Sequence, residues 1–148
     1  MVLEYDMLQI LTLGDKILTQ KAKRVARVDD TIRTLCISMV NTMLENNGIG
    51  LAANQVGVLK RIIVVLIEDK PTVMINPEIL EYSETLCEME EGCLSIPGEY
   101  LHISRPETVK VKFRDTKGKP HIGSYFGLTS RVIQHEIDHL DGITMDTK

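Results

Sequence analysis

Two histidines four residues apart are the first feature of this 148-residue chain that could do chemistry. They are His135 and His139 in the stretch QHEIDHLDG, and Glu136 follows the first of them. On a helix, residues at this spacing lie one turn apart on one face, so both imidazoles can reach the same ion. Glu136 would lie beside that ion without having to coordinate it. The pattern therefore predicts a metal ion, its water molecule and a base.

The apolar residues before the histidines indicate which way this helix faces. Leu128 and Val132 precede His135 by seven and three residues and fall on the same stripe. The histidines are thus expected to point into the protein, where an unpartnered pair would be costly to desolvate. The alternative is two ordinary surface or core histidines, because HExxH strings also arise by chance.

A third protein ligand has to come from upstream. Residues 140–148 contain no His, Cys or Glu. Gly142 matches the extended protease motif HExxHxxGxxH, but Met145 occupies the place of its third histidine.

The missing ligand could come from Cys36, Cys87, Cys93, His102 or His121, or from one of several acidic residues upstream. Cys36 belongs to an apolar helical stripe and is expected in the core. Cys87 is interpreted as structural, His121 as a solvated loop residue after KGKP, and His102 as a remaining candidate within a strand.

The surroundings of Cys93 favour it over the others. It lies in EEGCLSIPG, where Gly92 allows a close approach to the backbone and Pro97-Gly98 is expected to turn the chain away. Such a segment is suited to presenting a side chain.

Three motifs together make the chain resemble the peptide deformylase family. They are GIGLAANQ (48–55), EGCLS (91–95) and QHEIDH (134–139), in that order. HExxH alone occurs in unrelated proteases, whereas the three motifs in combination are highly specific. The resemblance extends from about Leu8 to Met145.

The resemblance implies that Cys93, His135 and His139 bind one divalent ion, with water in the fourth position. Ferrous iron is the ion expected natively, and zinc, nickel or cobalt are possible substitutes. An ion in such an open site lowers the pKa of its water from about 15.7 toward 7, and the resulting hydroxide attacks the formyl carbon.

The family's remaining catalytic roles fall on three further residues. Glu136 acts as general base and then as general acid. The Gln55 side chain and the Leu94 backbone N–H stabilise the oxyanion on the formyl oxygen.

The implied substrate is the N-formylmethionine of newly synthesised chains. The peptide would bind as an extended strand against the backbone around Ile49, Gly50 and Gly92. The methionine side chain would enter an apolar pocket whose expected walls are Leu128, Val132, Met89 and Ile49.

Two departures from the family limit what the resemblance implies. The chain stops nine residues after His139, without the C-terminal helix that docks bacterial relatives on the ribosome, so the resemblance does not carry ribosome docking over to this chain. Tyr100 stands where many relatives have arginine, so residue preference beyond the methionine does not carry over.

Two other classes were weighed against the deformylase. A noncatalytic protein with a structural metal would normally close the site with a fourth protein ligand, which the motifs do not supply. An HExxH zinc peptidase would need the missing downstream ligand. The presence of Glu136 and Gln55 favours an enzyme.

The elements that must position these residues follow from periodicity and turn chemistry. Helices are predicted over 32–44, with Asp29, Asp30 or Thr31 as N-cap and Asn46 to Gly48 at the end, and over 128–141, ended by Gly142. Strands are predicted over 62–67, 72–75 and 109–113, with turns at Asn76-Pro77 and around Gly118. We expect an α+β fold, a single peptide-deformylase-like catalytic domain over 1–148, with antiparallel or mixed sheets around a central HExxH-bearing helix.

Composition excludes several other partners. A net charge of −4 provides no basic surface for nucleic acid. Three cysteines do not form a disulfide framework, the N-terminus lacks a signal or transit pattern, and the longest apolar run, 62–67, is too short to cross a membrane. A cytoplasmic monomer is expected.

Overall fold

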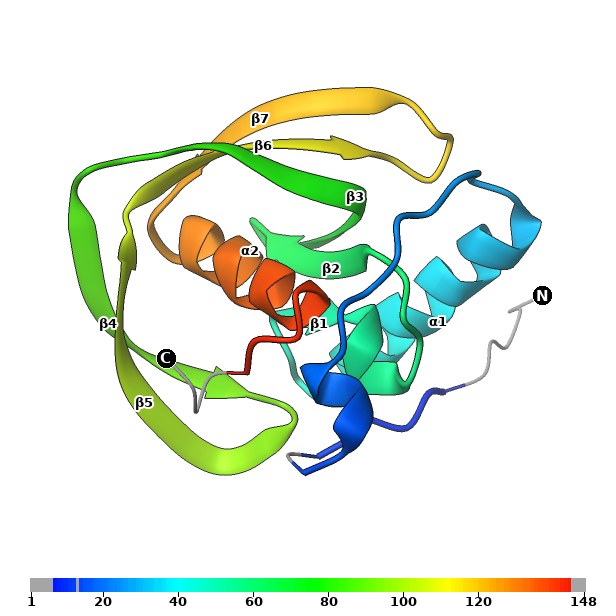
Figure 1. The fold of residues 1–148 in the computed structure, drawn as a ribbon, viewed down its shortest axis with the longest axis horizontal. Helices are drawn as coiled ribbons and strands as arrows, with labels where there is room; N and C mark the ends of the chain where they lie inside the picture. The colour runs from blue at the N-terminus through cyan, green and yellow to red at the C-terminus, as the bar shows by residue number, and fades with distance from the viewer. Residues whose placement is uncertain (1–6, 13, 145–148) are drawn as a thin grey trace.

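A five-stranded antiparallel sheet and a separate two-stranded hairpin surround one central helix (Figure 1). The computed structural model describes residues 7–12 and 14–144. The elements are η1 (Lys16–Thr19), α1 (Asp30–Glu45), β1 (Gly50–Ala52), η2 (Ala53–Val56), β2 (Ile62–Ile67), β3 (Lys70–Tyr82), β4 (Leu86–Cys93), β5 (Ile96–Pro106), β6 (Thr108–Arg114), β7 (Pro120–Phe126) and α2 (Gly127–Leu140). The predicted α+β class with a central HExxH-bearing helix is confirmed.

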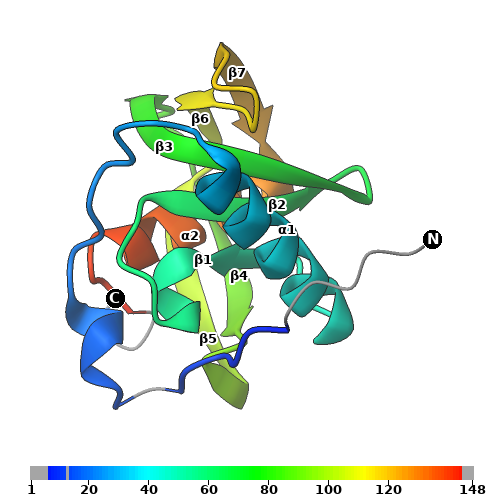
Figure 2. The same cartoon turned by 90° about the vertical axis from the view of Figure 1, so that its right-hand side faces the viewer.

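The larger sheet has the strand order β1-β2-β3-β6-β7 and carries a helix on each face of its β1–β2–β3 part. Side chains alternate across a strand, so Ile63 and Val65 of β2 pack with the α2 cluster. Ile62 and Val64 face the α1 cluster. Figure 2 shows α1 and α2 on opposite sides of β2. This double burial explains the uninterrupted apolar run of β2.

Both predicted helices form, with the expected ends. The Asp29 side chain accepts a hydrogen bond from the Ile32 N–H and caps α1. Asn47 and Gly142 adopt positive φ angles of 55° and 75° after the two helices. At Gly142 an added Cβ would lie only 2.6 Å from the Thr19 carbonyl oxygen, so glycine also permits close packing against the N-terminal segment.

The structure corrects three local predictions. Asn76-Pro77 is not a turn, because β3 continues through it with a register shift; the Asn76 amide bonds instead to the Val25 backbone. His121 lies in β7 and not in a loop. From this strand its side chain bonds to Asp115 and stacks on Phe113. The chain reverses after β4 at residues 94–95, whereas Pro97 and Gly98 lie within β5 at a register shift.

The other predictions on local structure are confirmed or lie outside the described residues. The strands over 62–67, 72–75 and 109–113 and the turn at Gly118 are present. Within the described residues, no helix has the length and apolar character needed to span a membrane. Met145, which occupies the third-histidine position of the extended protease motif, lies outside the described residues.

Candidate metal centre and active site

The end of β4 and the buried face of α2 bring three metal-binding side chains together. The ligand atoms of Cys93, His135 and His139 all lie within 4.8 Å of one another. Cys93 Sγ is 3.3 Å from His139 Nε2. A tetrahedral ion with bonds of about 2.0–2.3 Å separates its ligand atoms by roughly 3.3–3.8 Å. One thiolate and two imidazoles at these separations fit a divalent transition metal.

Glu91 fixes the orientation of the His135 ring. His135 Nδ1 is 2.8 Å from Glu91 Oε1, which leaves Nε2 available for an ion, in the usual carboxylate–histidine–metal arrangement. Burial by itself would raise the pKa of Glu91, but hydrogen bonds from His135 and Arg105 lower that pKa to about 2. Glu91 therefore remains a carboxylate at neutral pH and holds the ring.

The buried histidine rings differ in their charge preference. Burial, together with the charges of His135 and Arg105, lowers the pKa of His139 to about 3, so this ring is neutral, as a ligand must be. Burial would also lower the pKa of His135, but Glu136, Cys93 and Glu91 outweigh it and raise that pKa. This anionic environment attracts a cation, which a divalent metal can supply.

Glu136 lies beside these candidate ligands, and one of its carboxylate oxygens is free to react. The side chain is 4% exposed, and its Oε1 has no hydrogen-bond partner among the residues that the structure describes. Burial raises the pKa of Glu136 to about 7, which suits a group that takes up and releases a proton at neutral pH. A bound cation would shift that pKa downward.

The Gln55 amide is held in one orientation beside the cysteine. Its Oε1 accepts a hydrogen bond of 2.9 Å from the Ala52 N–H. Its Nε2 therefore points toward Cys93 Sγ at 3.5 Å and Ser95 Oγ at 3.1 Å. An amide fixed in this way is a preorganised donor beside the candidate ligands. Leu94 follows Cys93 in the turn.

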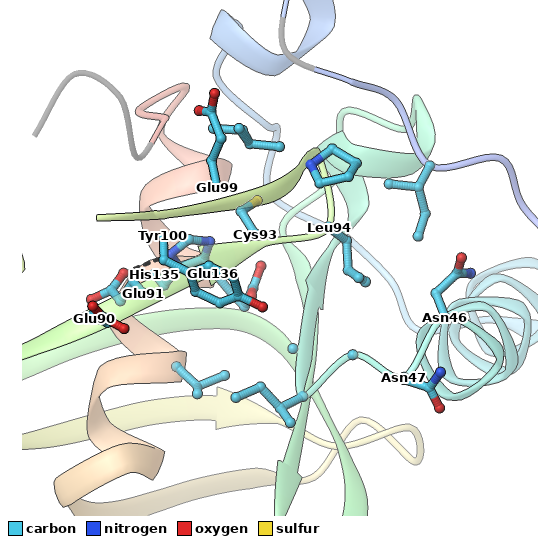
Figure 3. A pocket seen from close by; sticks show the side chains of 18 of the residues that line it. Asn46, Asn47, Glu90, Glu91, Cys93, Leu94, Glu99, Tyr100, His135 and Glu136 are labelled. Atoms are coloured by element: carbon cyan, nitrogen blue, oxygen red, sulfur yellow. Dashed lines mark hydrogen bonds and ion pairs between the residues drawn. The ribbon is translucent and has the colours of Figure 1, made fainter. Parts of the chain in front are cut away.

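A cavity of about 720 Å³ is lined by Cys93, His135 and Glu136, whereas His139 and Gln55 are not among its lining residues. Cys93, His135 and Glu136 lie together at one side of it (Figure 3). The expected substrate-binding residues that line it are Ile49, Gly50, Gly92, Leu128 and Val132, and Leu94, the expected oxyanion donor, lines it as well. Met89, also expected in its wall, is not among the lining residues; it lies on β4 paired with Ile103 and is 36% exposed.

The remaining candidate ligands lie apart from this centre. Cys36 is buried in the α1 core cluster. Cys87 lies on β4, His102 contacts Glu88 and Glu90 on the exposed hairpin, and His121 contacts Asp115.

Sequence reasoning assigned no role to four residues that support the centre: Glu91, Arg105, Arg131 and Ser95. Arg105 and Arg131 both contact Glu91, and Ser95 accepts a hydrogen bond from Gln55. For Arg131 a signal was available, since it is a charged residue one helical turn before His135 on the buried face.

Comparisons with known proteins agree with this geometry. A sequence model of the polypeptide deformylase family matches residues 7–147. The peptide deformylase of Picosynechococcus sp. is 55% identical over 141 residues, which are 92% of this chain and 75% of that protein. The peptide deformylase of Synechocystis sp. is 50% identical over 141 residues, again 92% of this chain and 75% of that protein.

Solved structures show the same fold. Peptide deformylase from Thermotoga maritima superposes with a TM-score of 0.95 at 38% identity, covering 97% of this chain and 98% of that one. The Met-Ala-Ser-bound enzyme from Acinetobacter baumannii has a TM-score of 0.93 at 38% identity, covering 97% and 99%. By its motifs, its fold and these matches, the chain belongs to the peptide deformylase family, metal-dependent hydrolases that remove the formyl group from N-formylmethionine peptides.

Proposed function

We propose that residues 1–148 form one catalytic unit that releases formate from the N-formylmethionine of newly synthesised chains, with Cys93, His135 and His139 holding one divalent ion. The observation that carries this proposal is the buried Oε1 of Glu136, which has no hydrogen-bond partner among the described residues and belongs to a side chain that lines the same cavity as Cys93 and His135. A purely structural metal site would have no use for such a carboxylate.

The substrate backbone would bind along the rim of the cavity. Among the described strands, β1 pairs only with β2. The other edge of β1, which starts at Gly50 in the cavity wall, is therefore available to an extended peptide. Ile49, Leu128 and Val132 offer apolar surface to the methionine side chain. A related enzyme has been solved with Met-Ala-Ser bound, which supports this class of ligand.

The chain's own groups would then handle the proton and the developing charge. When bound, the ion acts as a Lewis acid and lowers the pKa of water. Glu136 takes a proton on its free oxygen and later delivers it to the leaving amine. Gln55 Nε2 and the Leu94 N–H are proposed to donate to the oxygen that becomes negative in the transition state.

Ferrous iron is the proposed working ion. The donor set also suits zinc. Iron changes its coordination number more readily, however, so it could accommodate the formyl oxygen of the substrate as an additional ligand. The Cys93 thiolate would also be open to oxidation in air. Enzyme loaded anaerobically with iron should therefore turn over faster than the zinc form and lose activity in air, whereas nickel or cobalt forms should persist. A zinc form as fast as fresh iron enzyme would overturn this choice.

Glu136→Ala tests the assigned chemistry. The variant should keep its metal, since Glu136 is not a ligand, and should lose turnover of formyl-Met-Ala-Ser. Formate and free amino acids are measured together, because a peptidase would release amino acids and a noncatalytic protein would release neither. Glu88→Ala, at an exposed carboxylate outside the cavity, is the control. Normal formate release by metal-loaded Glu136→Ala would end the proposal.

A further inference from the structure

The β4–β5 hairpin supplies Cys93 but has little apolar packing of its own. Its apolar cluster consists of Ile96 and Ile103 with Cys93 packed against them. Among the described residues, neither of the two large core clusters contains a residue of β4 or β5. Figure 1 shows β4 and β5 running on from β3 and β6 and passing beside α2. Leu94 in the hairpin turn packs against the α1 cluster, but the position of the two strands relative to the histidines of α2 must depend on other contacts.

Arg131 of α2 makes polar contacts with both strands of this hairpin. Its side chain is buried, with 4% exposed. Nη1 donates to the Ile103 carbonyl of β5 at 2.8 Å and to Glu91 Oε2 of β4. Nη2 donates to the Cys87 carbonyl of β4. One guanidinium thus fastens two backbone carbonyls and one carboxylate of the hairpin to the helix.

Arg105 makes the reciprocal contact from hairpin to helix. It lies on β5, bonds to Glu91, and donates from Nη1 to Asp138 Oδ2 of α2 at 2.9 Å. The Glu91 carboxylate therefore forms hydrogen bonds with Arg105, Arg131 and His135 at the same time. Removing one cation from this buried set would leave acceptors without partners, which is costly.

Spacing along each element links Arg131 to the metal ligands. Arg131 precedes His135 by one helical turn on α2, and its partner Glu91 precedes Cys93 by two residues on β4. Metal sites tolerate ligand displacements of only about 0.2 Å. A clamp this close to both ligand-bearing segments can therefore set their separation.

We propose that Arg131 is a positioning residue that holds the β4–β5 hairpin at the distance from α2 at which Cys93 and the two histidines bind one ion. This inference rests on the ligand assignment of the proposed function. It adds a residue outside the ligand set that determines how tightly the ion is held.

Arg131→Gln and Arg131→Lys test the proposal, with Ni²⁺ as the probe. Arg131→Gln removes the fork of donors, whereas Arg131→Lys keeps the charge near Glu91 but cannot reach all three acceptors. Arg33→Gln is the control, because Arg33 also donates to two carbonyls, those of Thr116 and Val28, and to one carboxylate, that of Asp30 in its own helix, all away from the hairpin. Arg33 is more exposed, at 42% of its side chain.

Two measurements are made on each folded variant: the Ni²⁺ dissociation constant by chelator competition, and amide hydrogen exchange of β4 and β5 relative to β2 and β3. Arg131→Gln should weaken Ni²⁺ binding by about 10- to 100-fold, the usual effect of losing a group that supports a metal ligand, with faster exchange confined to β4 and β5. Arg131→Lys should lie between Arg131→Gln and the unchanged protein, and Arg33→Gln should leave both readouts unchanged. If Arg131→Gln does not fold, Arg131→Lys decides by the same criteria.

Unchanged Ni²⁺ affinity in the folded Arg131 variants, or faster exchange spread equally over β2 and β3, would overturn the inference. Cys93→Ala separates this failure from failure of the ligand assignment. If Cys93→Ala keeps full Ni²⁺ affinity, the ligand assignment is wrong. If Cys93→Ala loses affinity and the Arg131 variants do not, the positioning role alone is wrong.

Discussion

Replacing Gly50 with alanine should inactivate the enzyme while leaving it folded. Gly50 opens β1 and faces the catalytic helix. A Cβ added there would lie 2.6 Å from Glu136 Oε2 and 2.6 Å from Val132 Cγ1. The backbone itself permits alanine, because Gly50 is not among the residues with positive φ. The conflict therefore falls on the two side chains of α2.

The size of the effect follows from the displacement that the methyl group requires. Ordinary contacts begin at 3.4 Å, so the Glu136 oxygen must retreat by about 0.8 Å. Misplacing a catalytic group by 1 Å can cost about 100-fold in rate, equivalent to about 2.7 kcal/mol of barrier. Crowding a packed site also costs roughly 1–3 kcal/mol of folding free energy, which a folded domain can tolerate.

The assay compares kcat/KM on formyl-Met-Ala-Ser for metal-verified protein, with thermal unfolding measured on the same samples. Gly50→Ala should lose about 100-fold, mainly in kcat, with its metal retained. Gly123→Ala is the control, since its Cβ would meet the Tyr125 hydroxyl at 2.7 Å, the far end of a flexible side chain on β7. Wild-type kcat/KM in folded, metal-loaded Gly50→Ala would refute the reasoning about Glu136.

Four further outcomes are expected. Cys93→Ala should lose bound metal, while Cys36→Ala and Cys87→Ala should keep it. Metal analysis of the purified variants tests this expectation, and an empty site in Cys87→Ala would contradict the ligand assignment. Burial raises the pKa of the Cys36 thiol to about 11, so roughly a thousandth of it is thiolate at pH 8 and a thiol reagent should label it only after unfolding. Peptide mapping distinguishes Cys36 from the partly buried free thiols of Cys87 and Cys93, and prompt labelling of Cys36 in the folded protein would argue against this burial. Met39→Ala, at a side chain that is 0% exposed, should lose about 2–5 kcal/mol in denaturant unfolding without loss of metal. Hydrogen bonds from His121 and the backbone lower the pKa of Asp115 from 3.8 to about 2. The contribution of the Asp115 carboxylate to folding stability is therefore present above about pH 4 and is lost as the pH falls to 2. The difference in Tm between the unchanged protein and Asp115→Asn should shrink over that interval.

Local pattern was sufficient for features that depend on neighbours along the chain. The spacing of His135 and His139 placed both rings on one helical face, because an α-helix repeats every 3.6 residues. The Asp29 cap and the glycine at position 142 were likewise readable from their residue types. The combination of three motifs identified the family, and the comparisons confirmed it.

Local pattern failed where a distant segment decided the outcome. Asn76-Pro77 has the composition of a turn, but the Val25 backbone, 51 residues away, bonds the Asn76 amide and holds it as a bulge within β3. His121 became a strand residue because β6 and β7 pair across the turn and place it against Phe113. In both cases partners on another segment of the chain outweighed local turn preference.

The candidate site divides in the same way. By itself the sequence determined the helix pair, the glycine-rich segments and the residue types available for a metal. Only the tertiary structure decided that Cys93 Sγ lies 3.3 Å from His139, 46 residues later in the chain, and that Met89 stays outside the cavity. It also decided that Arg131 spans to the hairpin. Helical and strand periods fix which way a side chain faces on its own element, whereas distances between elements depend on register and on buried contacts that join segments far apart in sequence.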